Sequence, residues 1–567
     1  MDFADKANWV AADGEIIART QTLQTGLQAT CHVLSTTRNR AVVPVVVAGI
    51  RSSSPEVRAA VIRAAVRRHD PATHTELIRH FAELDDTDQT ILSETHHGMP
   101  HHAAPVLRKA VLEGDATLCA GACAIIQAAA DLEMFPTLLK AAENKKHHHL
   151  ADVLATIAVL TNVLYQDLAQ WAAGARAGVH DPSFARRHVL IALENSLGRY
   201  AQHQRTEILD AFLLLAPADN ATFLKILRDK HHACHAPMVA ALSTSEDSGI
   251  MERLVELLRD TDAPIAALEV VAERGDPQFL NILLHELKHP APLRVLHNMK
   301  RLHHVVWLES KRELLLELDG RAQAVAVDLA AASSISSESL FKLLEPVLGD
   351  GLAEGRRASC QALARFGDQK SDDLVVAAAH DPDAGVQAAA LRQLRTRRLP
   401  DALKLLVNRL DSSSVEVREA ARSSLAEFNF IRYRSMFDLL DDESARTTGR
   451  LVHKVDHSAC QKLLEELASP SLTVRLRAIE MAVAMAATDD IQPQLIELAH
   501  HENVAVRKEA VLALGHCHQG SIAPALDAAT RDPNGSVAEA ARTSIAQLQR
   551  AGVEMKLAPI TSRGRST

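Results

Sequence analysis

The stretch NVAVRKEAVLALG, residues 503–515, places Val506, Ala510 and Leu514 on one side of a predicted helix that ends at Gly515. At about 100° per residue these positions form one narrow stripe, so the segment presents a single face for burial. The same stripe recurs along the chain. Clear copies begin at Val57, Val386, Val417, Val474, Val506 and Val537, and fair copies begin at Ala185 and Gly355.

The spacing of these copies indicates a repeat. Weaker copies fill the gaps and begin near Thr87, Leu118, His149, His232, Pro264, Pro292, Val325 and Ala445. Successive copies then start mostly about 28–33 residues apart, which predicts about sixteen units with a period near 31 residues. The intervals from His149 to Ala185 and from Ala185 to His232 are longer. We expect an extra helix or a looped insertion in the second of them.

A second amphipathic segment precedes most copies of the stripe. PDALKLLVNRL at 400–410 and IMERLVELLRD at 250–260 are examples. A short polar turn then leads into the stripe, and several of these turns contain Asp-Pro or Ser-Pro. Asp and Ser side chains accept hydrogen bonds from the free amides at a helix start, and proline suits the first helical turn. The predicted unit is therefore helix, tight turn, helix.

The composition favours helices that pack closely on one another. The chain has 567 residues, more than one compact core usually covers. Apolar residues make up 47% of it and aromatic residues only 3%, which is typical of helical rather than strand-rich proteins. A pair of short helices cannot bury its apolar faces alone, so stacking completes the core. The sequence predicts an all-α, right-handed α-solenoid of about sixteen antiparallel helix pairs.

The regularity of the stripe divides the chain into five segments. Residues 1–38 are predicted to form capping helices, and residues 551–567 a disordered tail, because neither carries the stripe. Residues 39–200 are predicted to hold partly degenerate repeats, residues 201–340 degenerate, histidine-rich repeats with an insertion, and residues 341–550 regular repeats. We expect partner-specific surface in the irregular repeats and a structural framework in the regular half.

The repeat unit resembles the HEAT-repeat family of armadillo-type solenoids. VRKEAVLALG at 506–515 and VREAARSSLA at 417–426 are similar to the family's second helix, which follows an Asp/Pro turn. The resemblance covers about residues 40–550. Repeats of this kind occur in proteins with unrelated roles, so the resemblance implies an architecture and leaves the function open.

The resemblance also implies a ladder between neighbouring repeats, made by the turn Asp and the Arg that follows the first Val. The residues predicted to take part are Asp181 with Arg186, Asp411 with Arg418, and Arg475 and Arg507, which lack an Asp in the preceding turn. Gln387 and Ala538 depart from the pattern and are expected to interrupt the ladder. We expect these arginines to be structural rather than ligand-binding.

One histidine cluster has the spacing of metal ligands. In KHHACHAP, residues 230–237, a helix would place His231, Cys234 and His235 on one face, where they could bind one metal ion. Two features favour plain packing instead. His232 stands where other repeats have Val, and Pro237 indicates that a helix only starts here. Both readings remain open at this stage.

The charge balance disfavours nucleic acid as a partner. Acidic residues outnumber basic ones 71 to 62, and the net charge is −9. A nucleic-acid groove needs clustered basic residues and often aromatic stacking platforms. The main basic stretches, among them 391–398 and 430–437, accompany only three tryptophans and three tyrosines in the whole chain.

Other features predict a cytoplasmic protein with no membrane segment. The longest apolar run, AVVPVVVAGI at 41–50, is about half the ~20 residues that span a bilayer. The N-terminus has no basic segment followed by an apolar one, as a secretory signal would. Seven cysteines, an odd number in a long chain, indicate reduced thiols.

The sequence carries no catalytic motif. It contains no phosphate-binding loop, no nucleophile elbow and no zinc-protease helix signature. We therefore predict a non-enzymatic scaffold or adaptor without a cofactor, which binds a protein partner along the concave surface of the solenoid. The first alternative is a metal-binding or lyase-like helical-repeat protein with its ion at residues 231–235. The second is a nucleic-acid-binding protein with a basic groove.

Overall fold

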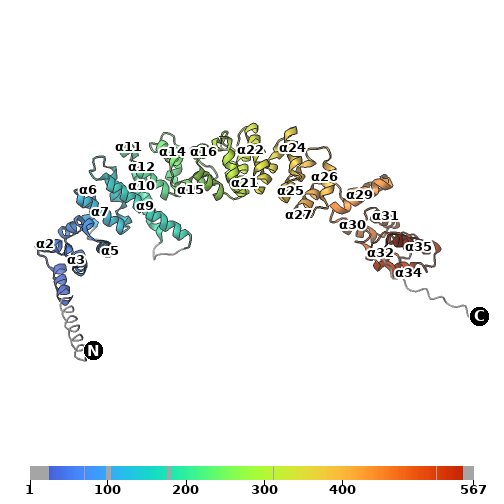
Figure 1. The fold of residues 1–567 in the computed structure, drawn as a ribbon, viewed down its shortest axis with the longest axis horizontal. Coiled ribbons are helices and arrows are strands. Elements are labelled where there is room, and N and C mark those ends of the chain that lie inside the picture. Colours follow the sequence, from blue (N-terminus) through green and yellow to red (C-terminus); the bar gives the residue numbers. More distant parts are fainter. Residues whose placement is uncertain are drawn as a thin grey trace, which may run out of the picture. The chain divides into compact units, whose positions relative to one another are not determined.

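In a computed structural model of the chain, the secondary structure of the described residues is entirely helical. The ranges described are 24–68, 70–97, 104–174, 181–310, 312–518 and 520–552. No strand occurs in them, and none of their helices is long and apolar enough to span a membrane. The all-α solenoid fold is thereby confirmed for this part of the chain (Figure 1). Most of the predicted N-terminal cap, residues 1–23, and of the predicted tail, residues 553–567, lies outside it.

The chain divides into two compact units. The first takes in the chain up to residue 311 together with residues 332–335, and the second takes in the rest. The first unit contains α2 Val42–Ile50, α3 Pro55–Arg67, α4 Pro71–Arg79, η1 Phe81–Glu83, α5 Asp86–His97, α6 Ala104–Glu113, α7 Ala116–Ala128, η2 Leu132–Met134, α8 Phe135–Glu143, α9 Leu150–Ala172, α10 Pro182–Leu197, α11 Tyr200–His203, α12 Thr206–Leu215, α13 Ala221–Arg228, α14 His235–Thr244, α15 Ser248–Leu257, α16 Ile265–Glu273, α17 Pro277–Glu286, α18 Leu293–Met299 and α19 Val306–Ser310.

The second unit is the more regular of the two. It contains α20 Arg312–Glu317, nearly all of α21 Gly320–Ala332, α22 Ser337–Asp350, α23 Ala353–Ala362, η3 Leu363–Arg365, α24 Gln369–Ala378, α25 Ala384–Leu394, α26 Ala402–Arg409, α27 Val415–Ser424, α28 Phe430–Met436, η4 Phe437–Leu439, α29 Asp442–Val455, α30 Ala459–Leu467, α31 Leu472–Ala484, α32 Gln492–Leu498, α33 Val504–Leu514, η5 Gly520–Ile522, α34 Ala523–Ala529 and α35 Gly535–Arg550.

The stripe at residues 503–515 forms α33, and its residues do what the pattern predicts. Val506, Ala510 and Leu514 are buried. The side chain of Asn503 accepts hydrogen bonds from the amides of Ala505 and Val506 at 2.9 and 3.4 Å and so caps the helix start. The turn residues Asp383 and Ser414 cap α25 and α27 in the same way. The capping role predicted for the polar turns is therefore confirmed at these helices.

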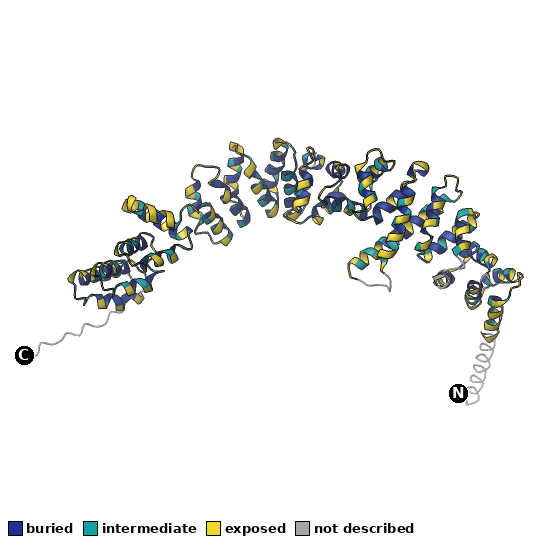
Figure 2. Cartoon of the chain, turned by 180° about the vertical axis from the view of Figure 1, so that it is seen from behind, coloured by how far each residue is buried: buried dark blue, intermediate teal, exposed yellow. Residues whose placement is uncertain are grey.

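In the second unit, stripe helices of successive repeats pack against one another in two groups. The row runs through α23, α25 and α27, and again through α29, α31, α33 and α35. Buried alanines at the contacts, such as Ala389 and Ala421, let the helices approach closely. Figure 2 shows the result in both units, with buried residues on the faces between helices and exposed residues outside.

The long interval between the stripes at Ala185 and His232 contains three helices, α11, α12 and α13. Helix α12 packs against α9 on one side and α15 on the other, and α15 packs against α17. The row that holds the stripe helices α3, α5, α7 and α9 is thus continued by α12, α15 and α17, whereas the later stripe helices α14 and α16 pack with each other. The stripe helix α10 already packs against α8 of the other row, so the stripe changes helix layer between α9 and α10, before the extra helices.

Candidate functional site

The arginine that follows the first Val of the stripe anchors its own turn. In four repeats its guanidinium donates to a main-chain carbonyl six residues earlier: Arg58 to Ser52, Arg418 to Ser412, Arg475 to Ser469 and Arg507 to His501. The donor–acceptor distances are 2.6–3.0 Å. The predicted structural role of these arginines has this local basis, because the bond closes the turn between the two helices of a repeat.

In three repeats the same arginine also pairs with an aspartate in the following repeat's turn, and the first of these pairs is Arg58 with Asp85. Arg507 binds Asp532 through two hydrogen bonds of 2.8 and 3.1 Å, and Arg356 binds Asp381 through two of 2.8 and 2.9 Å. The hydrogen bonds from Arg507 hold the pKa of Asp532 below its ordinary value. Burial opposes ionisation of Asp381, but the bonds from Arg356 and the amide of Asp383 outweigh it and lower the pKa of Asp381 as well.

The ladder therefore joins an arginine to the turn of the next repeat, and the sequence-based pairs need correction. Asp411 forms an ion pair with Lys454 at 2.6 Å and not with Arg418. The arginine that would reach Asp411 is missing, because the preceding repeat has Gln387 at that position and Gln387 donates to the carbonyl of Asp381 instead. The predicted interruption at Gln387 agrees with this arrangement.

The other predicted pair has different partners too. The Asp181 carboxylate accepts from the amide of Ser183 at 2.9 Å and caps α10. The Arg186 side chain donates to the carbonyl of Leu215 at 2.7 Å, so it binds the end of α12. Arg475 contacts the ring of His501 at 2.5 Å. Relative to Arg475, His501 occupies the position in the following turn that Asp532 occupies relative to Arg507.

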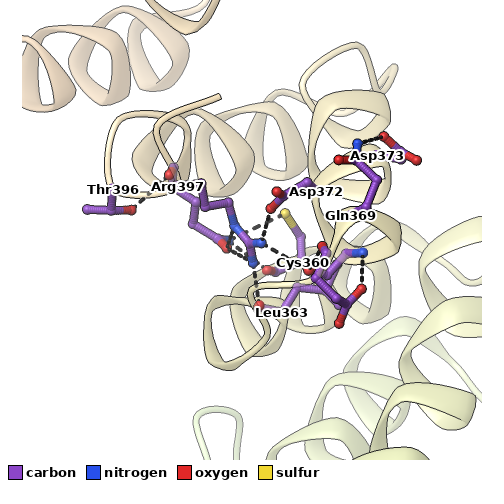
Figure 3. Close-up of polar contacts among 10 residues, drawn as sticks. Cys360, Leu363, Gln369, Asp372, Asp373, Thr396 and Arg397 are labelled. Atoms are coloured by element: carbon purple, nitrogen blue, oxygen red, sulfur yellow. Dashed lines mark hydrogen bonds and ion pairs between the residues drawn. The ribbon is translucent and has the colours of Figure 1, made fainter. Parts of the chain in front are cut away.

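Sequence reasoning missed a second set of structural arginines, which lie just after stripe helices. Arg397 donates to Asp372 at 2.7 Å and to the carbonyl of Leu363, and Figure 3 shows its side chain directed at both. Arg68 and Arg274 are nearly buried and donate to main-chain carbonyls about one repeat earlier, those of Leu34 and Leu242, at 3.1 and 2.7 Å. Their recurrence about one repeat after those carbonyls is the signal that could have revealed them.

The structure does not assemble the predicted metal ligands His231, Cys234 and His235. Residues 231–234 form a turn, and α14 begins only at His235, so the three do not share a helix face. The Cys234 thiol donates to the carbonyl of Leu197 at 3.5 Å, and Nδ1 of His235 contacts the carbonyl oxygen of Ile226 at 2.8 Å. Burial raises the pKa of the Cys234 thiol to about 11, so the thiol keeps its proton at neutral pH.

One local departure from the regular pattern of the second unit is the repeat formed by α28, η4 and α29, residues 427–459, which we call the divergent repeat. It borders a pocket of about 420 Å³. The pocket is lined by Arg395, Glu427, Phe428, Asn429, Arg432, Tyr433, Met436, Leu440, Thr448 and Val452. Its volume is in the range of pockets that bind small molecules, about 300–1,000 Å³.

The divergent repeat is firmly attached on its C-terminal side. Phe430, Tyr433 and Val452 belong to the buried core that extends to Leu548. The Tyr433 hydroxyl donates to the carbonyl of Ala445 at 2.8 Å. At Gly449 an added Cβ would lie only 2.6 Å from the Tyr433 hydroxyl and 3.0 Å from the main chain of Ala484, so glycine permits this close approach.

Apolar side chains project from the divergent repeat into solvent. Leu439 is 81% exposed, Ile431 66% and Met436 43%. Buried residues of α27 such as Val417 and Ala421 are not part of the core that starts at Phe430. The packing therefore loosens between α27 and the divergent repeat, and the pocket lies nearby, between the end of α25 at Arg395 and the divergent repeat.

Two basic stretches singled out in the sequence meet at this surface. Arg395, from residues 391–398, and Arg432, from residues 430–437, both line the pocket. Arg395 is paired with Glu427 and Arg434 with Glu466. Arg432 is exposed, so the surface combines apolar side chains with positive charge.

Comparisons with known proteins place the regular repeats on either side of this surface in one family. The family model described as HEAT repeats matches residues 340–426 and 460–546, and leaves residues 427–459 unmatched. No curated protein matches the chain.

The solved structures that are similar share little sequence with this chain. One, from work on a phosphorylation switch in the interaction between cadherin and beta-catenin, is 13% identical, with 89% of this chain and 99% of that chain covered and a TM-score of 0.28. Another, of Kap95p binding to RanGDP, is 10% identical, with 95% and 75% covered and a TM-score of 0.27. A structure of Kap121p is 14% identical, with 94% and 54% covered and a TM-score of 0.22. These likenesses are too distant to support an argument about function, whereas the family match shows that residues 340–426 and 460–546 are HEAT repeats.

Proposed function

We propose that this protein is a non-enzymatic scaffold or adaptor that binds a protein partner, and that the divergent repeat supplies the principal contact. The observation that carries the proposal is the exposed group Ile431, Met436 and Leu439 beside a pocket of about 420 Å³. Ile431 and Met436 lie in α28 and Leu439 in η4, and exposed apolar side chains gathered in one repeat beside a pocket favour an interaction site. Flanking regular repeats would hold this surface in place.

The chemistry of the surface favours an amphipathic partner segment with acidic side chains. The apolar face of such a segment would cover Met436 and Leu439. Its carboxylates would meet Arg432 at the pocket and the exposed Arg398 and Lys404, which line a neighbouring depression with Leu403. Affinity would come from the apolar anchors, and the charges would contribute orientation and association rate.

A protein partner is favoured over nucleic acid at this surface. Two of its arginines, Arg395 and Arg434, already have carboxylate partners, and Asp438 adds further negative charge. The buried ring of Tyr433 offers no stacking platform. Phosphate binding needs several free basic groups, and these ion pairs lower the number of free basic groups at the surface.

We also propose that the protein acts in the cytosol. All seven cysteines are free thiols, and five of them are buried. Reduced thiols are typical of cytosolic proteins, whereas secreted proteins usually pair them in disulfides.

The proposal can be tested by cross-linking and mass spectrometry on the full-length chain in its native cell. The test variant replaces Ile431, Met436 and Leu439 with serine. The matched control replaces Leu472 and Val504, exposed apolar residues of the regular repeats, with serine. We expect cross-links from the wild type and the control to converge on residues 395–452, and the test variant to lose the same partner by at least about tenfold, since two or three apolar anchors commonly contribute more than 1.4 kcal/mol together.

Two results would contradict the proposal. One is a partner retained equally by all three proteins. The other is binding that nuclease treatment abolishes, which would favour the nucleic-acid alternative.

A further inference from the structure

A cluster of three different metal-binding groups lies on the divergent repeat and the two repeats that follow it. The ligand atoms of His453, Cys460 and Asp490 all lie within 4.8 Å of one another, and His453 Nε2 is 3.0 Å from an oxygen of Asp490. Within the part of the chain that the structure describes, no other set of three His, Cys, Asp or Glu residues meets in this way.

The three residues come from successive repeats, which explains why they meet. His453 lies in the last turn of α29, Cys460 in the first turn of α30, and Asp490 in the turn before α32. Asp490 follows Cys460 by about one repeat period, so stacking of the repeats places the two positions side by side. A search for local ligand spacing could not find this group, because its members are joined through the repeat and not through one helix face.

The donor set fits zinc. An imidazole nitrogen, a thiolate sulfur and a carboxylate oxygen are all zinc ligands, with bond lengths of about 2.0–2.3 Å. In a tetrahedral site such ligands lie about 3.3–3.6 Å apart. The partly exposed side chains of His453 and Asp490 need move only slightly to reach that geometry. Calcium and magnesium prefer sites made of oxygen alone, so they fit less well.

The surroundings leave the cluster available to a cation. The neighbouring basic groups have other partners, Lys454 with Asp411 and His518 with Asp489. The negative end of the α29 dipole lies near His453, and the positive end of the α30 dipole near Cys460 favours a thiolate there. In the metal-free protein, burial and the charge of Asp490 raise the pKa of the Cys460 thiol. Binding of a divalent ion would therefore release the thiol proton to water.

We infer that His453 Nε2, Cys460 Sγ and a carboxylate oxygen of Asp490 bind one zinc ion, with water in the fourth position. The ion links α29, α30 and the turn before α32, and so fixes the divergent repeat to the regular repeats behind it. This inference is independent of the protein-binding surface, because none of the three ligands lines the pocket.

The test uses cobalt(II) as a spectroscopic substitute for zinc on the purified full-length chain freed of metal. We expect one cobalt ion per chain with a thiolate charge-transfer band in the near ultraviolet, displaced by zinc. Cys460→Ser removes the band. Outer-shell substitutions alone cost about 10- to 100-fold in metal affinity, so His453→Ala and Asp490→Asn should weaken binding by about a hundredfold or more.

A matched control separates this site from the histidine cluster of the first unit. The double variant His231→Ala with His235→Ala should keep the band and the affinity of the wild type. Circular dichroism checks that each variant is folded, and Asp490→Asn, which changes one exposed carboxylate, carries the test if Cys460→Ser does not fold. Absence of a thiolate band in the wild type, a band that survives Cys460→Ser, or a band lost in the control would each overturn the inference.

Discussion

Helix α27 has two unlike neighbours. Against α25 it packs through buried alanines, including Ala389 and Ala421, and the hydroxyl of Ser424 donates to the carbonyl of Leu391 at 3.0 Å. Toward α29 it makes polar, solvent-facing contacts, such as the bond from Arg422 to the carbonyl of Lys454 at 2.9 Å. Helix α27 thus packs closely against α25, which carries a regular stripe. Its interface with α29, whose stripe is weak, is more open.

The regular repeats bury their stripe faces against one another, whereas the departure from the pattern leaves apolar surface exposed. Close packing leaves no apolar area for a partner, whereas the divergent repeat leaves Ile431 and Leu439 in solvent. We expected the C-terminal half to be framework throughout, although the weak stripe near Ala445 already departed from the pattern. The following substitutions test how far the two interfaces of α27 differ.

The largest effect is expected in the regular interface. Leu391 of α25 is fully buried, so Leu391→Ala leaves a cavity and should lower the free energy of unfolding by about 2–5 kcal/mol. Because repeats unfold locally, hydrogen exchange of the α25 and α27 amides is the suitable measurement, beside urea denaturation. Leu439→Ala is the control. Equal protection in both variants would mean that the α25–α27 interface is not close-packed.

The second-largest loss of unfolding free energy is expected in the ladder. Arg356→Ala removes two charge-assisted bonds to Asp381 and one to the carbonyl of Gly351, and should cost about 1.5–3 kcal/mol. Arg418→Ala removes bonds to main-chain carbonyls only and should cost less. Urea denaturation measures both, and a larger loss at Arg418 would contradict the ladder as described.

The ladder pair also predicts a pH dependence. The pKa of Asp381 is lower in the folded protein than in the unfolded chain, where an aspartate titrates near about 3.9. The stabilisation from Asp381 is therefore complete above that value and is lost as the pH falls through the folded pKa. The stability difference between the wild type and Arg356→Ala should shrink on acidification, as measured by urea midpoints across the acidic range. A difference that grows at low pH would contradict this assignment.

The two faces of α29 offer a sharper comparison. Gly449→Val introduces atoms against Tyr433 and Ala484 and should destabilise the divergent repeat by about 1–3 kcal/mol. Thr448→Val, one residue earlier but lining the pocket, should be nearly neutral. Hydrogen exchange in α29 measures both changes. Equal effects would mean that the face of α29 toward the pocket is packed as tightly as the face toward Tyr433 and Ala484.

The smallest effect is expected between α27 and α29. Lys454→Ala removes an exposed ion pair with Asp411, and exposed pairs of this kind contribute little. The unfolding free energy should change by less than about 0.5 kcal/mol. A loss as large as that of Leu391→Ala would show that polar contacts hold this interface closed.

Much of the fold could be predicted from the sequence, and the site could not. The stripe at 503–515 and its turn cap Asn503 belong to one local segment, so their pattern predicts the helix and its start directly. The metal cluster suggested by His231, Cys234 and His235 depended on a helix that the turn before α14 does not form. The partner of Asp411 depended on an arginine missing from another repeat. Such features involve residues far apart, and a single pattern does not specify them.

By itself the sequence determined the helical unit, its period and the positions that are buried, because these follow from side-chain spacing within about thirty residues. The tertiary structure alone decided which repeats meet closely, where the packing opens at α28 and α29, and which distant groups come together, as His453, Cys460 and Asp490 do. The physical reason is that local spacing sets the face that each helix buries, whereas contacts between repeats depend on how two such faces fit each other.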